Sequence, residues 1–224
     1  MSLTICSRVN CEMDEITITP CPATPRNYCD FLLLFVARKA MVINMLYMFL
    51  AEGFEEVEAL APLDILRRTQ LNVKTVGVGD NFITGTHGVT VVCDLSTTGL
   101  EIPEFFDGII LPGGMPGTEN LEKNKTVQAF IDYSFENDKY ICAICAAPSI
   151  LGHKGYLKGR QATCFPGYEK ELEGAVISSE SVVRDSKFIT AKGMGVATQF
   201  GLEIVSAFLG NDEAQELKRK IQAI

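Results

Sequence analysis

The chain has 224 residues, 47% of them hydrophobic and 21% charged, which suits one α/β domain with a full core, or one domain with an appendage. Its formal net charge of −8 argues against a nucleic-acid surface, because phosphate binding needs clustered Lys and Arg. Eight cysteines at uneven spacings argue against a disulfide scaffold, and two histidines far from any cysteine pair argue against zinc-finger modules, so we expect a reducing, cytoplasmic environment.

Residues 1–40 differ in character from the rest of the chain. Their first part is polar and has three prolines between positions 20 and 25, and their one apolar run, FLLLFV, is far shorter than the roughly 20 residues needed to cross a bilayer. A natural start at Met41 or Met45 is plausible. We expect an extension that is poorly ordered or a non-native start, followed by a single domain over residues 41–224, with no membrane contact.

From Met41 onward, strand and helix patterns alternate with short loops. The strands are expected at 42–51, 73–78, 89–93, 107–111, 140–144, 161–165 and 187–191, with a hairpin arm over 176–184; the helices at 55–68, 124–136, after Cys145, from 193–195 through Phe208, and at 213–223. Pro62 is expected to kink or shorten the first helix. This order predicts an α/β fold with a mostly parallel central sheet and helices on both faces.

The stretch around Cys145 begins as a buried strand and ends as the small-residue start of a helix. A cysteine at such a turn is pushed out of the packed layer toward the carboxyl edge of the sheet. The positive end of the following helix is expected to favour its thiolate. Cys145 is therefore the candidate nucleophile, unless it is one of the many inert buried cysteines.

Two other strand ends carry residues that could serve Cys145. Gly113 and Gly114 let backbone N–H groups approach a ligand, and with the N–H of Ala146 they could form an oxyanion hole, although Pro-Gly-Gly is also an ordinary turn. After the first strand, Glu55 and Glu56 are expected to be solvated acids at a helix start. Glu58 has apolar neighbours and could point inward as a protonated carboxyl group.

The remaining motifs point away from redox-pair and metal chemistry. Cys142 and Cys145 form a C-x-x-C, but Cys142 belongs to the strand, so we favour a buried structural cysteine over a redox pair. His87 and His153 lack metal-ligand partners at a useful spacing, and the sequence contains no nucleotide-binding or HExxH motif. We expect no metal and no cofactor.

Four segments carry a family resemblance. They read AEGFEEVE at 51–58, LPGG at 111–114, AICAAP at 143–148 and TAKGMG at 190–195. Together and in this order they resemble the DJ-1/ThiJ/PfpI superfamily, in its DJ-1-like branch, and the resemblance covers about residues 43–222.

The resemblance implies a flavodoxin-like three-layer sandwich with a nucleophile elbow, usually as a homodimer. Cys145 matches the family nucleophile, and Glu58 matches the carboxylic acid that hydrogen-bonds its sulfur. Gly114 and Ala146 match the backbone donors around the cysteine.

Three positions narrow the expected chemistry. Ala146 stands where the protease-like branch carries His, which makes a Cys-His peptidase or amidase doubtful. Phe165, in the segment TCFP, replaces a histidine that many relatives carry. His87 falls where relatives place Arg or His, so we regard His87, Phe165 and Gly113 as possible site neighbours.

The first functional hypothesis is a cofactor-independent enzyme acting on small reactive carbonyls, glyoxalase III-like or protein deglycase-like, in a stress-response role. Its substrate would be a small aldehyde or a glycated molecule. The alternative is a redox sensor or chaperone that uses oxidation of Cys145. A PfpI-type peptidase and a thiazole-biosynthesis role fit these residues less well.

Overall fold

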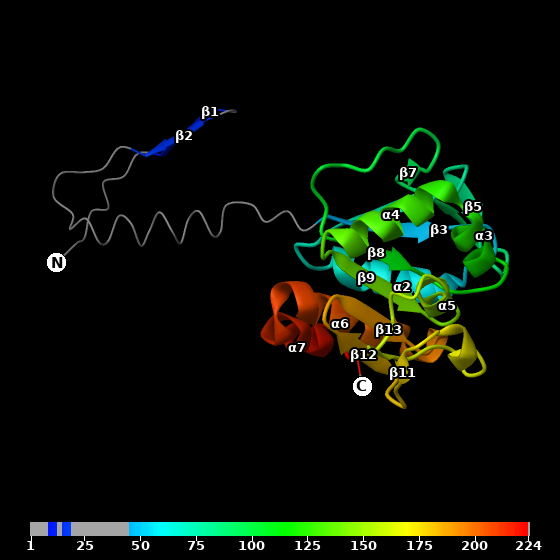
Figure 1. Cartoon of the computed structure of the whole chain (residues 1–224). Coiled ribbons are helices and arrows are strands. Elements are labelled where there is room, and N and C mark those ends of the chain that lie inside the picture. The colour runs from blue at the N-terminus through cyan, green and yellow to red at the C-terminus, as the bar shows by residue number, and fades with distance from the viewer. Residues whose placement is uncertain (1–8, 13–14, 19–44, 224) are drawn as a thin grey trace. The chain divides into compact units, whose positions relative to one another are not determined.

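The computed structural model describes residues 9–12, 15–18 and 45–223. The chain divides into two units, Met1–Val42 and Ile43–Ile224. In the first, β1 (Val9–Glu12) and β2 (Glu15–Ile18) pair as antiparallel strands (Figure 1). Most of the expected extension over 1–40 lies outside the described residues, so its order and origin stay a prediction.

The second unit alternates strands and helices, as the sequence predicted. Its strands are β3 (Met45–Leu50), β4 (Asn72–Gly77), β5 (Phe82–Thr84), β6 (Thr90–Val92), β7 (Leu95–Ser96), β8 (Gly108–Leu111), β9 (Tyr140–Ile144), β10 (Gln161–Ala162), β11 (Val176–Ile177), β12 (Val182–Asp185) and β13 (Phe188–Ala191). Its helices are α2 (Glu56–Arg67), α3 (Gly117–Lys123), α4 (Lys125–Glu136), α5 (Pro148–His153), α6 (Ala197–Leu209) and α7 (Asn211–Lys220), with short 3₁₀ turns at Glu169–Glu171 and Met194–Val196.

Seven of these strands form the central sheet, in the order β12-β13-β9-β8-β3-β4-β7. All neighbouring pairs are parallel except β12 with β13. The hairpin arm over 176–184 resolves into β11, which pairs with β10, and β12, which forms the antiparallel edge. The expected mostly parallel α/β sheet is confirmed.

Helices cover both faces of the sheet, which makes three layers (Figure 1). Along β3, Leu46, Met48 and Leu50 belong to the core shared with α2, α6 and α7, whereas Tyr47 and Phe49 belong to the core shared with α3, α4 and α5. Successive side chains of a strand point to opposite faces. A strand buried on both faces is therefore apolar at every position, which is how β3 was recognisable in the sequence.

Helix α2 places its first turn at the carboxyl end of β3. Its N-cap is Glu55, whose side chain accepts a hydrogen bond from the N–H of Glu58 at 2.7 Å. Glu56 and Glu58 then occupy the positive end of the helix dipole, and Arg67 lies in the last turn. The helix continues through Pro62 to Arg67, so the expected shortening at this proline was wrong.

Other elements also differ from the expectation: the short strands β5 and β7 were not predicted, and two further differences lie near the site. The strand expected over 161–165 covers only Gln161 and Ala162, because the chain turns to follow Cys145 at Phe165. Helix α3 was not predicted; it follows directly after the glycine-rich turn at the end of β8. None of the helices in the described part of the chain is long and apolar enough to cross a membrane.

Candidate functional site

The site lies at the carboxyl ends of β3, β8 and β9. After β3 the chain runs outward to β4 and β7, and then returns to the other side of β3 as β8. The strand order therefore reverses between β3 and β8, which is where parallel α/β sheets bind ligands. The loops after these strands bring together Glu58, Gly113 and Cys145.

Cys145 occupies a sharp turn between β9 and α5. Its backbone φ is +66°, a conformation that few residues other than glycine adopt. Two hydrogen bonds hold it there: its N–H donates to the carbonyl of Ala191, and its carbonyl accepts from the N–H of Phe165, both at 2.9 Å. The strand-to-helix turn expected from the sequence is present, with the cysteine at the strained position.

Glu58 is buried beside this turn with 2% of its surface exposed. Its carboxyl group accepts hydrogen bonds from the N–H of Gly113, at 3.1 Å, and from the N–H of Met194, and it bonds to the Cys145 thiol. Burial nevertheless raises its pKa from the ordinary 4.5 to about 7, because the charged form loses its hydration. Glu58 can therefore both take and give a proton near neutral pH.

The pKa of the Cys145 thiol is shifted in the opposite direction from the expectation. Burial and the neighbouring Glu58 carboxylate raise its pKa to about 12, while the N–H groups of Ala146 and Gly114 act to lower it. The helix start was expected to favour the thiolate, but α5 spans only Pro148–His153 and its field is outweighed by desolvation and a nearby like charge. Formation of the Cys145 thiolate therefore depends on transfer of the thiol proton to Glu58.

Gly113 is the residue that lets thiol and carboxyl meet. A Cβ on Gly113 would lie 2.5 Å from the Cβ of Cys145 and 2.6 Å from Oε2 of Glu58, closer than real atoms pack. Its N–H is also the donor to Glu58. The Pro-Gly-Gly turn is thus a close-approach site and not only a chain reversal.

Glu56 is buried, which corrects the expectation of a solvated acid. It accepts hydrogen bonds from the N–H and from Nδ1 of His87, at 2.6 and 2.9 Å, and from the N–H of Val89 at 3.4 Å. Glu56 therefore fixes the turn between β5 and β6, where Gly85 leaves it room. The His87 ring is hydrogen-bonded to Glu56, and among the described residues no hydrogen bond or ion pair joins His87 to Cys145 or Glu58.

Glu55, Glu56 and His87 also form a group of metal-ligand types, with atoms within 4.8 Å of one another. Each carboxylate is already engaged: Glu55 caps α2, and Glu56 binds the turn that carries His87. These internal hydrogen bonds account for the cluster.

Phe165 lies at the rim of the site. Its side chain is 47% exposed, and its Cδ2 is 3.3 Å from the position that a Cβ on Gly193 would take. Oε1 of Glu58 is 3.5 Å from the same position. Phe165 and the Glu58 carboxyl thus border the same space beside Gly193.

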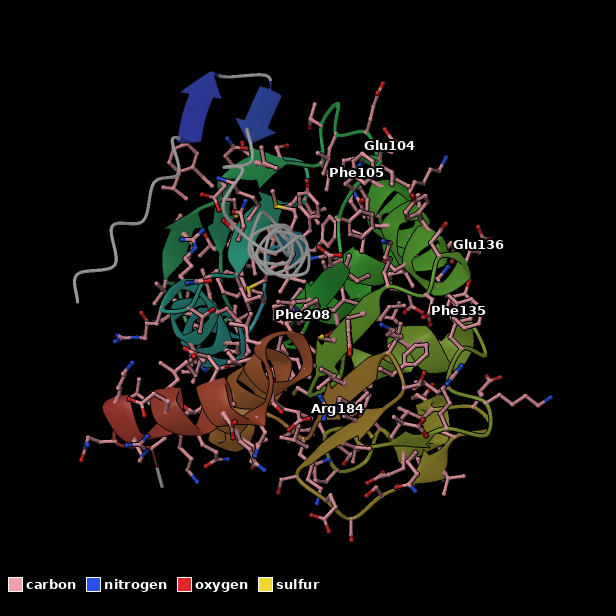
Figure 2. The ribbon with its side chains drawn as sticks, turned by 90° about the vertical axis from the view of Figure 1, so that its left-hand side faces the viewer. Glu104, Phe105, Phe135, Glu136, Arg184 and Phe208 are labelled. Carbon is pink, nitrogen blue, oxygen red and sulfur yellow. The ribbon has the colours of Figure 1, made fainter. Side chains whose placement is uncertain are left out.

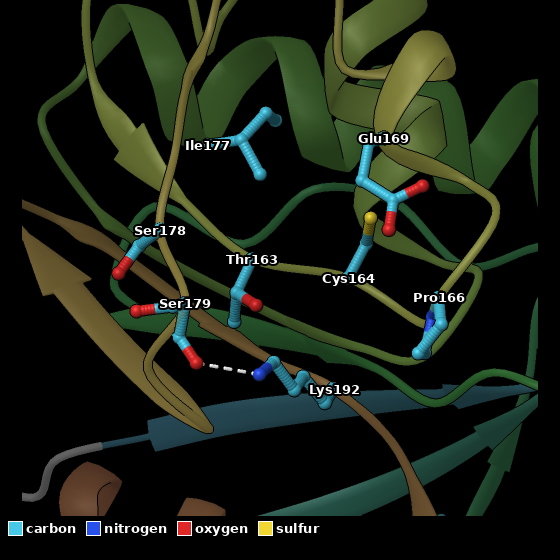
Figure 3. A pocket seen from close by; sticks show the side chains of 8 residues that line it. All are labelled: Thr163, Cys164, Pro166, Glu169, Ile177, Ser178, Ser179 and Lys192. Atoms are coloured by element: carbon cyan, nitrogen blue, oxygen red, sulfur yellow. Dashed lines mark hydrogen bonds between the residues drawn. The ribbon is translucent and has the colours of Figure 1, made fainter.

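A cavity of about 350 Å³ lies beside the segment that carries Phe165 (Figure 3). Its lining is Thr163, Cys164, Pro166, Glu169, Ile177, Ser178, Ser179 and Lys192. Lys192 donates from Nζ to the carbonyl of Ser179 at 2.5 Å. Neither Cys145 nor Glu58 lines this cavity, so it is distinct from the cysteine site.

The other cysteines of the second unit are structural. Cys142 is fully buried in β9 and free, as expected, and burial raises its pKa. Cys93 and Cys164 are also buried and free, and burial raises the pKa of each to about 11. Cys145 differs from them in being partly exposed and in having a carboxyl partner.

Sequence reasoning missed two contributors to the site. The Met194 N–H binds Glu58, and Gly193 leaves space for the Phe165 ring. Their segment, TAKGMG, had been singled out only as a family motif. The signal was the pair of glycines directly after a buried strand, the same pattern that marked Gly113.

Comparison with known proteins agrees with this geometry. A sequence model of the DJ-1/PfpI family matches residues 44–207. The protein dj-1beta of Drosophila melanogaster is 29% identical over 187 residues, which are 82% of this chain and 96% of the relative. Protein DJ-1 homolog B of Arabidopsis thaliana is 32% identical over 170 residues; the match covers 75% of this chain but only 39% of that longer protein.

Solved structures give the same result. A mutant of a DJ-1 superfamily protein from Salmonella typhimurium superposes with a TM-score of 0.76 at 33% identity, covering 80% of this chain and 98% of the other. Toxoplasma gondii DJ-1, in a structure described as oxidized, gives 0.76 at 26% identity, with 80% and 98% covered. The resemblance first suggested by four short segments is thus a relationship: this chain belongs to the DJ-1/PfpI family.

Proposed function

We propose that this protein is a cofactor-independent enzyme that converts small reactive carbonyls, with Cys145 as nucleophile and Glu58 as its base. The observation that carries the proposal is the buried pair itself: a carboxyl group with a pKa of about 7, bonded to a thiol at a strained turn. Gly114 and Ala146 supply backbone N–H groups beside the same sulfur.

The proposed reaction begins when the sulfur of Cys145 attacks the aldehyde carbon of a 2-oxoaldehyde. Glu58 takes the thiol proton as the carbon–sulfur bond forms, so the high thiol pKa does not prevent attack. The carbonyl oxygen becomes an oxyanion that the N–H groups of Gly114 and Ala146 stabilise. Return of the proton to this oxygen gives a hemithioacetal and an ionised Glu58.

Glu58 next removes the proton from the former aldehyde carbon and delivers it to the adjacent keto carbon, while the hydroxyl proton of the first carbon passes to the keto oxygen. The first carbon is oxidised and the second reduced, so no external oxidant or reductant takes part. The product is a thioester of a 2-hydroxy acid, which water hydrolyses to release the acid and restore the thiol. The same attack on a glycated amine adduct would give the deglycase form of the activity.

Consumption of methylglyoxal and release of lactate test the proposal. Cys145→Ser is expected to reduce turnover to the uncatalysed background, and Glu58→Gln to reduce it by about 100-fold or more, the usual contribution of a positioned base. Cys93→Ala, which removes a buried thiol outside the site, serves as the matched control. Equal turnover by the wild type and Cys145→Ser would exclude the activity.

A redox-sensing role is the second candidate. Peroxide would oxidise Cys145 to the sulfenic and then the sulfinic acid, each step transferring one oxygen and releasing water, and the protonated Glu58 could donate a hydrogen bond to the sulfinate. The related Toxoplasma gondii structure described as oxidized favours including this candidate. Intact-mass measurement after mild peroxide should show two added oxygens that Cys145→Ala loses; an unchanged mass would rule the role out.

We also infer a homodimer. Phe82 and Val92, which face each other across the β5–β6 hairpin, are 62% and 65% exposed, and Val57 on the outer face of α2 is 43% exposed. The hairpin turn is fixed to the start of α2 through Glu56. Exposed apolar side chains on two elements joined in this way favour burial against a second copy.

A further inference from the structure

Three exposed, large apolar residues lie in the chain segments that build the Cys145–Glu58 site. Phe165, Met194 and Met115, which we call the apolar rim, are 47%, 53% and 41% exposed. Exposure of single apolar residues is common on protein surfaces, so exposure alone implies nothing. What distinguishes these three residues is that their backbones lie in the segments hydrogen-bonded to Cys145 and Glu58.

Two residues of the apolar rim are hydrogen-bonded to the reacting pair through the main chain, and the third directly follows a residue that is. The N–H of Phe165 donates to the carbonyl of Cys145 at 2.9 Å, and the N–H of Met194 donates to the Glu58 carboxyl. Met115 directly follows Gly114, whose N–H reaches the Cys145 thiol. The hydrogen bonds that build the site therefore hold the backbones of Phe165 and Met194 beside it, and Met115 follows at the next position after Gly114.

Phe165 has the best defined place among them. Its ring edge packs over Gly193, within contact of the position a Cβ would occupy there, and Oε1 of Glu58 borders the same space. An aromatic ring at this point presents an apolar surface beside the carboxyl group that moves the proton. A substituent on the substrate next to the reacting carbons would meet that surface.

The charges near the apolar rim do not favour an anionic or strongly polar substituent. The ionised Glu58 repels a carboxylate, and its burial shows that the space around it is poorly hydrated. Lys192, next to Gly193 in the chain, directs its ammonium group to the Ser179 carbonyl in the separate cavity (Figure 3). That cation is therefore engaged within the separate cavity.

We propose that the apolar rim makes the site selective for 2-oxoaldehydes with an aromatic or branched alkyl substituent, over glyoxal and over charged or sugar-derived carbonyls. This selectivity rests on the proposed activity and specifies its substrate class. The reaction is the same internal redox step: an aryl-substituted 2-oxoaldehyde plus water gives the aryl-substituted 2-hydroxy acid. Phenylglyoxal is the simplest probe, and its product is mandelate.

The first test compares kcat/KM for phenylglyoxal and glyoxal in the wild type, Phe165→His and Met194→Gln. Phe105→His is the matched control, because Phe105 is 77% exposed and lies just before β8, at the sheet edge opposite the site (Figure 2). The phenylglyoxal-to-glyoxal ratio is expected to fall by about tenfold in Phe165→His, the usual worth of an apolar contact in specificity, and less in Met194→Gln. The control should keep the wild-type ratio.

A second readout does not require turnover. The rate of Cys145 alkylation by N-benzyl iodoacetamide, relative to iodoacetamide, measures the apolar preference of the same space with two neutral reagents. We expect the benzyl reagent to be favoured several-fold in the wild type and the preference to disappear in Phe165→His, with the unfolding temperature of the variant measured to check that it is folded.

The two readouts separate the two proposals. If neither aldehyde is converted but the benzyl preference depends on Phe165, the enzymatic proposal is wrong and the apolar preference of the site is supported. If aldehydes are converted and both ratios are the same in wild type and Phe165→His, the apolar rim is wrong and the activity stands.

Discussion

Burial of Glu58 lowers the free energy of unfolding by an amount that depends on pH. Its native pKa of about 7 lies above the ordinary 4.5, so the folded protein holds this proton more tightly than the unfolded chain does. Below pH 4.5 both states are protonated and the group contributes no penalty. As pH rises from 4.5 to about 7 the unfolded chain ionises while the folded protein keeps the proton, so stability falls; above 7 both states are ionised and the penalty stays constant.

Glu58→Gln is therefore expected to lose this pH dependence. Relative to the variant, the wild type should lose up to about 3 kcal/mol of unfolding free energy between pH 4.5 and 8, the equivalent of its pKa shift. Urea unfolding at several pH values measures the difference, with Glu104→Gln on the exposed 97–107 loop as the control (Figure 2). A difference between wild type and Glu58→Gln that is constant with pH would contradict the buried, proton-holding carboxyl.

At the scale of elements, the site depends on how closely the loop after β8 approaches the elbow after β9. Gly113→Ala would place a methyl group within 2.6 Å of both Cys145 Cβ and Glu58 Oε2. We expect about 1–3 kcal/mol of destabilisation from overpacking and a loss of turnover of tenfold or more. Gly195→Ala is the control, because a Cβ there meets open space without unfavourable backbone strain. Equal effects of the two changes on turnover would show that Gly113 is an ordinary turn residue.

The sequence predicted most elements of this unit for identifiable reasons. Strands buried on both faces, such as β3, read as continuous apolar runs, and the acids and arginines at the two ends of α2 marked its limits. Cys145 was singled out because it stands at a strand end, and Glu58 because its sequence neighbours are apolar and the family motif places an acid there. Local patterns and a family motif were sufficient there.

The errors arose where distant segments decide the outcome. Glu56 was predicted to be solvated, but a turn thirty-one residues away folds over it and donates three hydrogen bonds. The Cys145 pKa was predicted from the helix that follows it, whereas burial and Glu58, from another helix, dominate. Neither partner can be read from the neighbouring sequence.

At the scale of the whole molecule, the exposed β5–β6 hairpin predicts self-association. Val92→Glu places a charge on the surface that we expect to be buried in a homodimer, and should shift the protein to monomer because a charge in an apolar interface lacks a partner. Phe105→Glu changes an apolar residue of the same unit that is even more exposed, and serves as the control. Analytical ultracentrifugation checks the masses; a wild-type monomer, or a dimer that Val92→Glu leaves intact, would exclude this surface.

The central claim is that Glu58 controls the proton of Cys145, and the pH dependence of Cys145 alkylation tests it most directly. The rate for iodoacetamide in the wild type should rise with an apparent pKa of about 7, since that value belongs to the proton that the pair shares. In Glu58→Gln this step should be absent, and the rate should rise only at the higher pH where the buried thiol itself ionises. Identical profiles in the two proteins, each with a single rise above pH 8, would contradict the claim.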